Sequence, residues 1–215
     1  MADLQKLHDA ILSGDAKTAA AAAQEALGQK VPPIELVQHA MVPAMDEVGR
    51  RFECQDYFVP ELLLSARAMK AALELLRPLL AASGAQPAGT VVIGTVQGDL
   101  HDIGKNLVAA LLEGGGFEVI DLGADVAPEK FVETVQRTHA NIVCLSALLT
   151  VTMLSMRTTI EGLKAAGLRD RVKVLVGGAP VTRQFADEIG ADGYGENASV
   201  AVSLARTLTA PAAIG

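Results

Sequence analysis

The sequence predicts an α/β protein in which an N-terminal four-helix bundle precedes a five-stranded parallel, doubly wound sheet. Residues 1–82 contain only stretches whose apolar residues recur at helical spacing, interrupted by Gly and Pro. From residue 90 onward, short apolar runs of strand length alternate with helical stretches in five units, which is typical of a parallel sheet covered on both faces. The segment 83–89, rich in Gly, Pro and Ala, separates the two patterns, so we expect domains at 1–85 and 86–215.

Residues that start or end helices divide the first half. Gly14 and Gly28 end the first two helices, and Asp15 is expected to cap the second. Pro60 opens the last helix, where proline is tolerated in the first turn. Pro43 lies inside the third helix and should kink or restart it, because proline has no N–H to donate. The expected helices cover 2–14, 15–29, 34–55 and 61–82.

The second half repeats a strand followed by a helix. In parallel sheets of this kind, ligands bind at the carboxyl ends of the strands. Chemically unusual residues at strand ends are therefore candidates for a site. The expected strands cover 90–96, 117–123, 141–147, 171–178 and 191–195, and the expected helices cover 102–115, 127–140, 151–167, 180–190 and 196–210.

Composition excludes several classes of function. The net charge is -7, and no Arg-rich run is present, which argues against a nucleic-acid binder. The N-terminus does not resemble a signal peptide, and no apolar run reaches the roughly 18 residues that span a membrane. Cys54 and Cys144 form no pair in the sequence, and Cys144 is expected to pack in a strand. Cys54 is either a free thiol near a site or a residue that packs within a helix, and packing is the favoured expectation. A reducing cytoplasm is the expected compartment.

Three strand ends carry candidate site residues. "GDLHDIG", residues 98–104, follows the first strand and places Asp99 two residues before His101. Hydroxyl residues follow the third strand, and Gly177-Gly178 end the fourth. Purely structural interpretations are that Asp102 only caps the next helix and that the two glycines only make a turn.

His101 is the histidine with a carboxylate positioned to bond its ring. His8, His39 and His139 are expected to be ordinary surface residues without an acidic neighbour. An Asp bonded to one imidazole nitrogen fixes the tautomer and raises the basicity of the other, which suits a metal ligand or a general base. Zinc wants more protein ligands than this edge offers, and a base would need a nucleophile such as Ser146. A single His also suits a metal held mainly by a macrocycle.

These residues match a known family. "GDLHDIGKNLV", followed by "SALLT" and "VGGAP", resembles the Asp-x-His-x-x-Gly … Ser-x-Leu … Gly-Gly signature of cobalamin-binding domains. "MDEVGRRFECQDYFVPELLLSARAMKAALELLRPLL" is similar to the helical cap of cobalamin-dependent methionine synthase and of the corrinoid proteins of methanol, methylamine and O-demethylase methyltransfer systems. The resemblance covers nearly the whole chain and implies a Rossmann-like, flavodoxin-like cofactor domain beneath a helical cap.

Carried over by position, the resemblance implies cobalamin bound base-off and His-on, with His101 as the lower axial ligand of cobalt. Asp99 would bond the far ring nitrogen, and Thr152 would continue the relay where methionine synthase has Ser. Phe52, Val59 and Leu62 match the apolar cover of the upper face, although Val59 departs from a Leu. Further implied contacts with the corrin and its nucleotide tail are Gly98, Leu100, Asp102, Ile103, Gly104, Ser146, Leu148, Thr150, Gly177, Gly178, Gly195, Glu196, Asn197 and Ala198.

The implied function is that of a corrinoid methyl carrier. Such a protein shuttles a methyl group as methyl-Co(III) from a donor-specific methyltransferase to a second methyltransferase that acts on tetrahydrofolate, a pterin or a thiol. We expect transient contact with both, possible contact with a reductive activator, and no catalytic barrel within the chain. Two alternatives are a cobalamin-sensing regulator, which would need a basic recognition helix, and the cobalamin subunit of a carbon-skeleton mutase, which has no need of the cap.

Overall fold

The structure is a computed structural model that describes residues 4–84 and 86–210. The chain divides into two compact units, Met1–Pro87 with Glu113–Gly116, and Ala88–Leu112 with Phe117–Gly215. We refer to them as the helical unit and the sheet unit and describe each by itself. Along the described residues, no helix combines the length and apolar character needed to cross a membrane.

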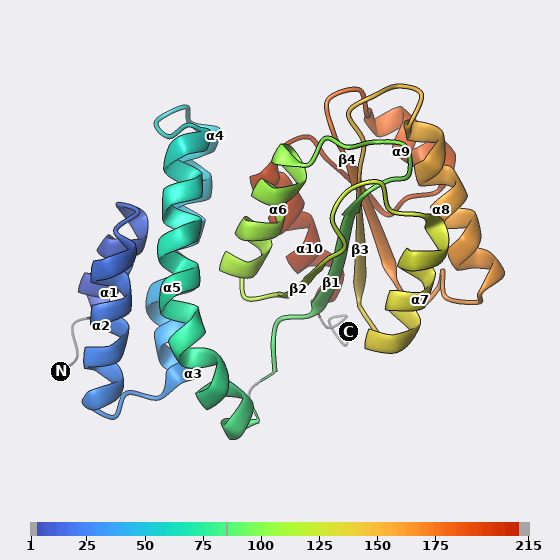
Figure 1. Ribbon diagram of the computed structural model, residues 1–215. Helices are drawn as coiled ribbons and strands as arrows, with labels where there is room; N and C mark the ends of the chain where they lie inside the picture. Colours follow the sequence, from blue (N-terminus) through green and yellow to red (C-terminus); the bar gives the residue numbers. More distant parts are fainter. Residues whose placement is uncertain (1–3, 85, 211–215) are drawn as a thin grey trace, which may run out of the picture. The chain divides into compact units, whose positions relative to one another are not determined.

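The helical unit has the predicted helices, with one interruption (Figure 1). Asp15 caps α2 as expected, since its side chain accepts a hydrogen bond from the Thr18 amide. The third predicted helix is broken by a π-helical turn immediately before Pro43, which confirms the expected effect of that proline. The helices are α1 (Leu4–Leu12), α2 (Ala16–Gly28), α3 (Pro33–Leu36), the π turn η1 (Val37–Met41), α4 (Val42–Glu53) and α5 (Val59–Ser83).

The sheet unit contains the predicted parallel sheet. Its strands lie in the order β2-β1-β3-β4-β5, and every neighbouring pair is parallel. The central strands read as apolar runs because both of their faces are covered. The predicted α/β class and doubly wound sheet are therefore confirmed. The strands are β1 (Thr90–Thr95), β2 (Glu118–Asp121), β3 (Ile142–Ser146), β4 (Lys173–Gly177) and β5 (Gly193–Gly195).

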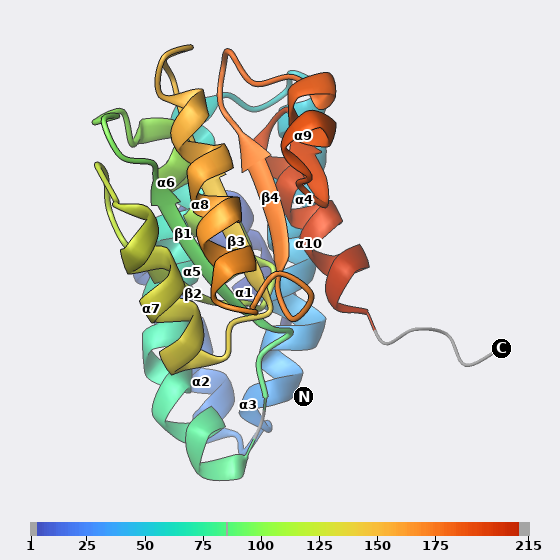
Figure 2. The same cartoon turned by 90° about the vertical axis from the view of Figure 1, so that its right-hand side faces the viewer.

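Five helices cover the two faces of this sheet. Figures 1 and 2 show α7, α8 and α9 on one face and α6 and α10 on the other. Phe131 of α7 and Met156 and Ile160 of α8 are completely buried in the core of the first face. The helices are α6 (Ile103–Gly114), α7 (Pro128–Thr138), α8 (Met153–Ala165), α9 (Arg183–Ile189) and α10 (Ala198–Thr209).

The strand order places a topological switch point between β1 and β3. The chain leaves β1 toward β2 on one side and leaves β3 toward β4 on the other, so the loops that follow these two central strands diverge. The predicted His loop follows β1, and the hydroxyl-rich loop follows β3. The topology therefore brings together, at one edge, segments about fifty residues apart in the sequence.

The two cysteines differ in their surroundings. Cys144 lies on β3 and is buried, as predicted, and burial raises the pKa of its thiol to about 12. Cys54 is exposed at the C-terminal cap of α4, so the expectation that it packs within a helix is wrong. Both are free thiols.

Candidate cofactor site at the carboxyl edge of the sheet

A buried carboxylate holds an exposed imidazole in the loop between β1 and α6. Asp99 Oδ1 lies 2.7 Å from His101 Nδ1 and also accepts a hydrogen bond from the His101 amide at 3.0 Å. The Asp99 side chain has no exposed surface, whereas the His101 side chain is 51% exposed. The predicted pair is thus formed by a rigid acceptor beneath an accessible ring.

The second oxygen of Asp99 is held by the loop that follows β3. Asp99 Oδ2 accepts hydrogen bonds from the Leu148 amide at 2.7 Å, the Leu149 amide at 3.2 Å and Thr152 Oγ1 at 2.7 Å. Thr152 Oγ1 also lies 2.8 Å from the Leu149 carbonyl oxygen. The Asp99–Thr152 contact is the one predicted for the relay, and the two backbone amides add donors that side-chain patterns do not reveal.

These donors keep Asp99 ionised. Burial by itself raises the pKa of the Asp99 carboxyl, because it removes water from the charge. The hydrogen bonds from Thr152, from the amides of His101 and Leu148 and from the His101 ring outweigh burial and hold this pKa well below its usual range. The carboxylate can then only accept, so the proton of the short contact lies on Nδ1, and in the neutral form of the ring Nε2 carries the free lone pair.

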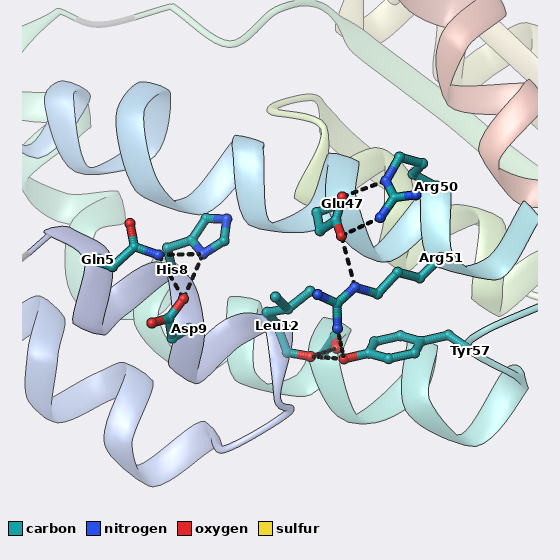
Figure 3. Close-up of polar contacts among 9 residues, drawn as sticks. Gln5, His8, Asp9, Leu12, Glu47, Arg50, Arg51 and Tyr57 are labelled. Atoms are coloured by element: carbon teal, nitrogen blue, oxygen red, sulfur yellow. Dashed lines mark hydrogen bonds and ion pairs between the residues drawn. The ribbon is translucent and has the colours of Figure 1, made fainter. Parts of the chain in front are cut away.

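A second His–Asp pair shows what distinguishes His101. His8 Nδ1 lies 3.0 Å from Asp9 Oδ1, so the expectation that His8 lacks an acidic neighbour is wrong (Figure 3). The Asp9 side chain, however, is 61% exposed and belongs to a surface helix. The Asp99–His101 pair therefore differs from the His8–Asp9 pair in the burial of its carboxylate, which holds the ring from a fixed position.

Two carboxylates, one at the end of β2 and one in the loop that follows it, brace the segment from Gly98 to Lys105. Asp125 Oδ1 accepts a hydrogen bond from the Gly98 amide at 2.7 Å, where Gly98 has a φ of 86°. At the other end, Asp121 Oδ2 lies 2.5 Å from Nζ of Lys105, whose side chain is buried. The sequence analysis missed these braces, although a lysine directly after the His motif, at the start of an apolar helix, is an available signal.

Large apolar side chains are exposed in the His101 loop and in the loop after β3 that holds Asp99. Leu100 and Ile103 flank His101 and are 75% and 77% exposed. Leu148 and Val151 of the loop after β3 are 44% and 74% exposed. Exposed apolar side chains in the loop of an accessible imidazole and in the neighbouring loop fit a flat and largely apolar ligand.

The glycines expected to contact the cofactor fall into two groups. A Cβ on Gly104, at the start of α6, would meet nothing within 4 Å, so this position leaves open space. A Cβ on Gly177 would lie 2.8 Å from the Gly195 carbonyl oxygen, and one on Gly178 only 1.9 Å from that of Ala147. Close backbone approach therefore explains the Gly pair, and the open space at Gly104 is the feature that suits a ligand.

The other predicted contact residues lie at the same edge or at the end of β5. Ser146 is half-buried at the end of β3, and Thr150 is exposed in the following loop. Asp102 directly precedes α6, and its side chain accepts from Asn106 Nδ2 at 3.1 Å. The remaining residues form the start of α10, where Asn197 caps the helix through the Val200 amide, Glu196 is exposed and Ala198 is buried.

The predicted cover residues lie at the junction of α4 and α5. Phe52 is half-buried near the end of α4, and Val59, the first residue of α5, is 39% exposed. Leu62 has no exposed surface, so its side chain packs within the helical unit in this structure. Phe58, which the sequence analysis missed, is 62% exposed and is the larger apolar surface here.

A site built around one histidine narrows the choice of metal. Within residues 4–84 and 86–210, no group of three or more His, Cys, Asp or Glu side chains is arranged to hold a metal ion. His101 can therefore contribute one ligand to a metal whose other ligands come from elsewhere, as in a macrocyclic cofactor. The half-exposed ring with a free Nε2, the apolar rim and the open space at Gly104 all fit such a group.

Comparison with known proteins agrees with this site. Two family models, each described as a B12 binding domain, match residues 89–203 and residues 3–77. A trimethylamine corrinoid protein of Methanosarcina acetivorans is 44% identical over 95% of this chain and 96% of its own length. A dimethylamine corrinoid protein of Methanosarcina barkeri is 44% identical over 96% of this chain and 97% of its own.

A solved structure shares the fold of both units. The methanol:cobalamin methyltransferase complex from Methanosarcina barkeri matches 96% of this chain and 79% of the compared chain, with 32% identity and a TM-score of 0.85. The fold and site thus define a B12-binding protein. The chain belongs to the B12-binding domain family and, within it, to the corrinoid proteins, and its cofactor is a corrinoid.

Proposed function

We propose that this protein is a methyl carrier that moves a methyl group between two methyltransferases. The observation that carries the proposal is the buried Asp99 carboxylate, which orients the half-exposed His101 ring at the switch point of the sheet. When bound, the corrinoid supplies the cobalt to which the methyl group is attached. The chain's own residues hold that cofactor, tune its lower ligand and shield its upper face.

His101 is proposed as the lower axial ligand in a base-off, His-on arrangement. Asp99 fixes Nδ1 as the protonated nitrogen, so Nε2 presents its lone pair to the metal. Because Asp99 is itself held by donors from a second loop, the ring has little freedom to rotate. Leu100 and Ile103 then provide an apolar floor beside the ligand.

Asp99 and Thr152 are proposed to regulate how strongly His101 binds. An ionised Asp99 raises the basicity of the imidazole, and protonation of Asp99 lowers it. The Thr152 hydroxyl donates to Asp99 at 2.7 Å, so it stabilises the ionised carboxylate. A proton taken up by this relay would loosen the ligand, and its release would tighten it.

The remaining predicted residues are proposed to hold the nucleotide tail and to cover the upper face. Gly104 leaves room for the tail at the start of α6, and the loop and helix starts near Ser146 and Asn197 would line its path. Phe52 and Val59 are proposed to shield the methyl group from water. Since a partner must reach the same methyl group, the cover must move aside, and segment 83–89 is the proposed hinge.

The named relatives suggest the partners. Several of them are trimethylamine or dimethylamine corrinoid proteins, so a methylated amine is the first donor to test. The solved complex pairs a corrinoid-binding chain with a methyltransferase, which supports docking to one catalytic partner. We propose a second methyltransferase as acceptor and a reductive activator that restores the cofactor.

Reconstitution tests the proposal. The chain is loaded with hydroxocobalamin, reduced, and mixed with a methylamine methyltransferase and a methylated amine; the light-sensitive methyl-corrinoid is then measured. We expect methylation that His101→Gln abolishes or strongly slows. His139→Asn is the matched control, because His139 lies at the end of α7 in a left-handed conformation that Asn tolerates. Equal methylation of wild type and His101→Gln would contradict the role of His101, and no methylation with any amine, methanol or methyl ether donor would contradict the carrier function.

A further inference from the structure

The loop between α4 and α5 presents apolar side chains from an ordered backbone. Phe58 is 62% exposed and Val59 is 39% exposed, although apolar side chains of this size generally turn inward where a loop can rearrange. Gln55 adopts a left-handed conformation with a φ of 62°, which fixes the turn that precedes them. Interactions with the rest of the helical unit must therefore hold this loop so that the Phe58 and Val59 side chains stay at the surface.

The hydroxyl of Tyr57 attaches the loop to the end of α1. Tyr57 Oη donates a hydrogen bond to the Leu12 carbonyl oxygen at 3.1 Å, across 45 residues of sequence (Figure 3). Leu12 is the last residue of α1, and the final carbonyls of a helix lack partners within that helix. Ser65 Oγ of α5 donates to the same oxygen at 3.1 Å. One helix-end carbonyl is thus held by two donors, one from the loop and one from a helix.

Arg51 fixes the same tyrosine from the other side. Arg51 Nη1 donates to Tyr57 Oη at 3.1 Å, and the guanidinium carbon lies 5.1 Å from the centroid of the ring. The Arg51 carbonyl accepts the amides of Asp56 at 2.8 Å and Tyr57 at 3.1 Å. Arg51 therefore holds the loop through both its side chain and its backbone.

Glu47 orients Arg51. Glu47 Oε1 accepts Arg51 Nε at 2.8 Å, and its carboxylate also accepts two hydrogen bonds from Arg50, at 2.6 and 2.7 Å. Hydrogen bonds from Arg50 and then Arg51 lower the pKa of Glu47 to about 2, so the carboxylate is ionised throughout the physiological range. The chain of contacts runs from Glu47 through Arg51 and Tyr57 to the end of α1, as Figure 3 shows.

We propose that Tyr57 is a positioning residue, whose hydroxyl latches the α4–α5 loop to α1 and so holds Phe58 and Val59 in one orientation. This inference rests on the proposed function, in which the junction of α4 and α5 covers the upper face of the corrinoid. A cover that moves aside in each cycle must return with its contact surface already arranged. An unlatched loop would let Phe58 turn inward and leave the face open to water.

Two matched variants separate the latch from general stability. Tyr57→Phe keeps the ring over Arg51 but removes the hydroxyl, and Ser65→Ala removes the other donor to the Leu12 carbonyl. Each variant leaves that carbonyl with one donor, so both are expected to fold. Tyr57→Phe also removes the acceptor of Arg51 Nη1, so its loss of stability should equal or exceed that of Ser65→Ala. Only Tyr57 belongs to the loop, so only Tyr57→Phe should loosen it.

The first measurement is hydrogen–deuterium exchange in the corrinoid-free protein. Amides of residues 54–59 should exchange at least about two- to tenfold faster in Tyr57→Phe than in wild type. That factor is expected from loss of the hydrogen bond to Leu12 alone, and the hydroxyl also accepts from Arg51 Nη1. The same amides in Ser65→Ala should match wild type even if its melting temperature falls equally. Unchanged exchange in Tyr57→Phe, or equal acceleration in both variants, overturns the latch.

The second measurement links the latch to the cover. The proteins are loaded with methylcobalamin, and the rate of methyl loss in light and air is compared for wild type, Tyr57→Phe, Ser65→Ala and Phe58→Ala. Faster loss in Tyr57→Phe and Phe58→Ala, but not in Ser65→Ala, supports the inference. Faster methyl loss in Phe58→Ala alone overturns the role of Tyr57 as a latch but still supports Phe58 as part of the cover. Wild-type rates in all variants overturn the positioning role, because there is then no cover for Tyr57 to position. The carrier function is tested separately, by methylation of the reconstituted wild-type protein.

Discussion

Replacing Asp99 with Asn tests the site most severely among single substitutions. The two side chains have the same shape, but the carboxylate only accepts hydrogen bonds, whereas the amide must donate from one side. In the structure, Oδ1 faces two donors of His101, and Oδ2 faces the Leu148 and Leu149 amides and the Thr152 hydroxyl. Either orientation of Asn therefore points an NH₂ group at buried donors.

Of the two orientations of Asn, the one with its NH₂ group facing His101 costs less unfolding free energy. The ring can then shift its proton from Nδ1 to Nε2 and accept from Asn, but the His101 backbone amide still loses its partner. One buried donor without a partner costs about 1–3 kcal/mol, and the loss of the charged acceptor adds to this, so we expect a loss of roughly 2–4 kcal/mol in the free energy of unfolding. The same tautomer protonates Nε2, which can no longer bind cobalt.

Urea unfolding of the corrinoid-free protein near neutral pH measures this loss. The chain has two tyrosines and no tryptophan, with Tyr57 in the helical unit and Tyr194 in the sheet unit. In a Tyr57→Phe background, tyrosine fluorescence therefore reports the sheet unit alone, which matters because two units need not unfold together. Asp125→Asn is the control: Asp125 is exposed, and an amide oxygen can still accept from Gly98.

The control should stay within about 0.5 kcal/mol of the parent protein. If Asp99→Asn were as stable as Asp125→Asn, the hydrogen bonds to Asp99 would not constrain the site as described. If Asp99→Asn were destabilised but kept a His-ligated corrinoid, the tautomer argument would be refuted instead.

Three further predictions concern the same edge. Ala at Gly178 should prevent folding of the sheet unit, because φ is 127° and a Cβ would lie 1.9 Å from the Ala147 carbonyl oxygen, whereas Ala at Gly104 should leave circular dichroism unchanged and weaken corrinoid retention. Thr152→Val should lower the unfolding free energy of the sheet unit by about 1–2 kcal/mol in urea titrations, since it removes a buried donor to Asp99, and Thr152→Ser should retain most of it. The folded-state pKa of Asp99 lies below the ordinary value of 3.8, so the unfolded chain binds more protons in acid. The stability that Asp99 contributes is therefore complete above pH 3.8 and is lost as the pH falls further. The unfolding free energy of Asp99→Asn should accordingly fall less steeply than that of wild type between roughly pH 4 and pH 2.

Much of the fold could be predicted because local patterns agree with it. The glycine- and proline-containing linker, the alternation of strands and helices and the effect of Pro43 all depend on short stretches of sequence. The Asp99–His101 pair could also be predicted, because two residues of separation within one loop allow the contact. Each of these features is set by neighbours along the chain.

The features that escaped prediction depend on distant backbone. The Leu148 and Leu149 amides that hold Asp99 carry no side-chain signal, since any residue offers the same N–H. Gly178 is required by the carbonyl of Ala147, which directly follows the neighbouring strand β3, and a sequence pattern cannot show this approach. Leu62 and Phe58 illustrate the same limit: the family resemblance pointed to Leu62, whose side chain is buried, and not to Phe58, which is 62% exposed.

The central claim is that His101 binds the corrinoid metal through its ring. The EPR spectrum of the protein loaded with cob(II)alamin tests it directly, when the protein is prepared with natural histidine and again with ¹⁵N-histidine. A nitrogen ligand from the protein should change each cobalt line from a triplet to a doublet on labelling, and His101→Ala should remove the coupling to histidine. Triplets that persist in the labelled wild-type protein would show that the cofactor's own base, and not His101, occupies the lower position.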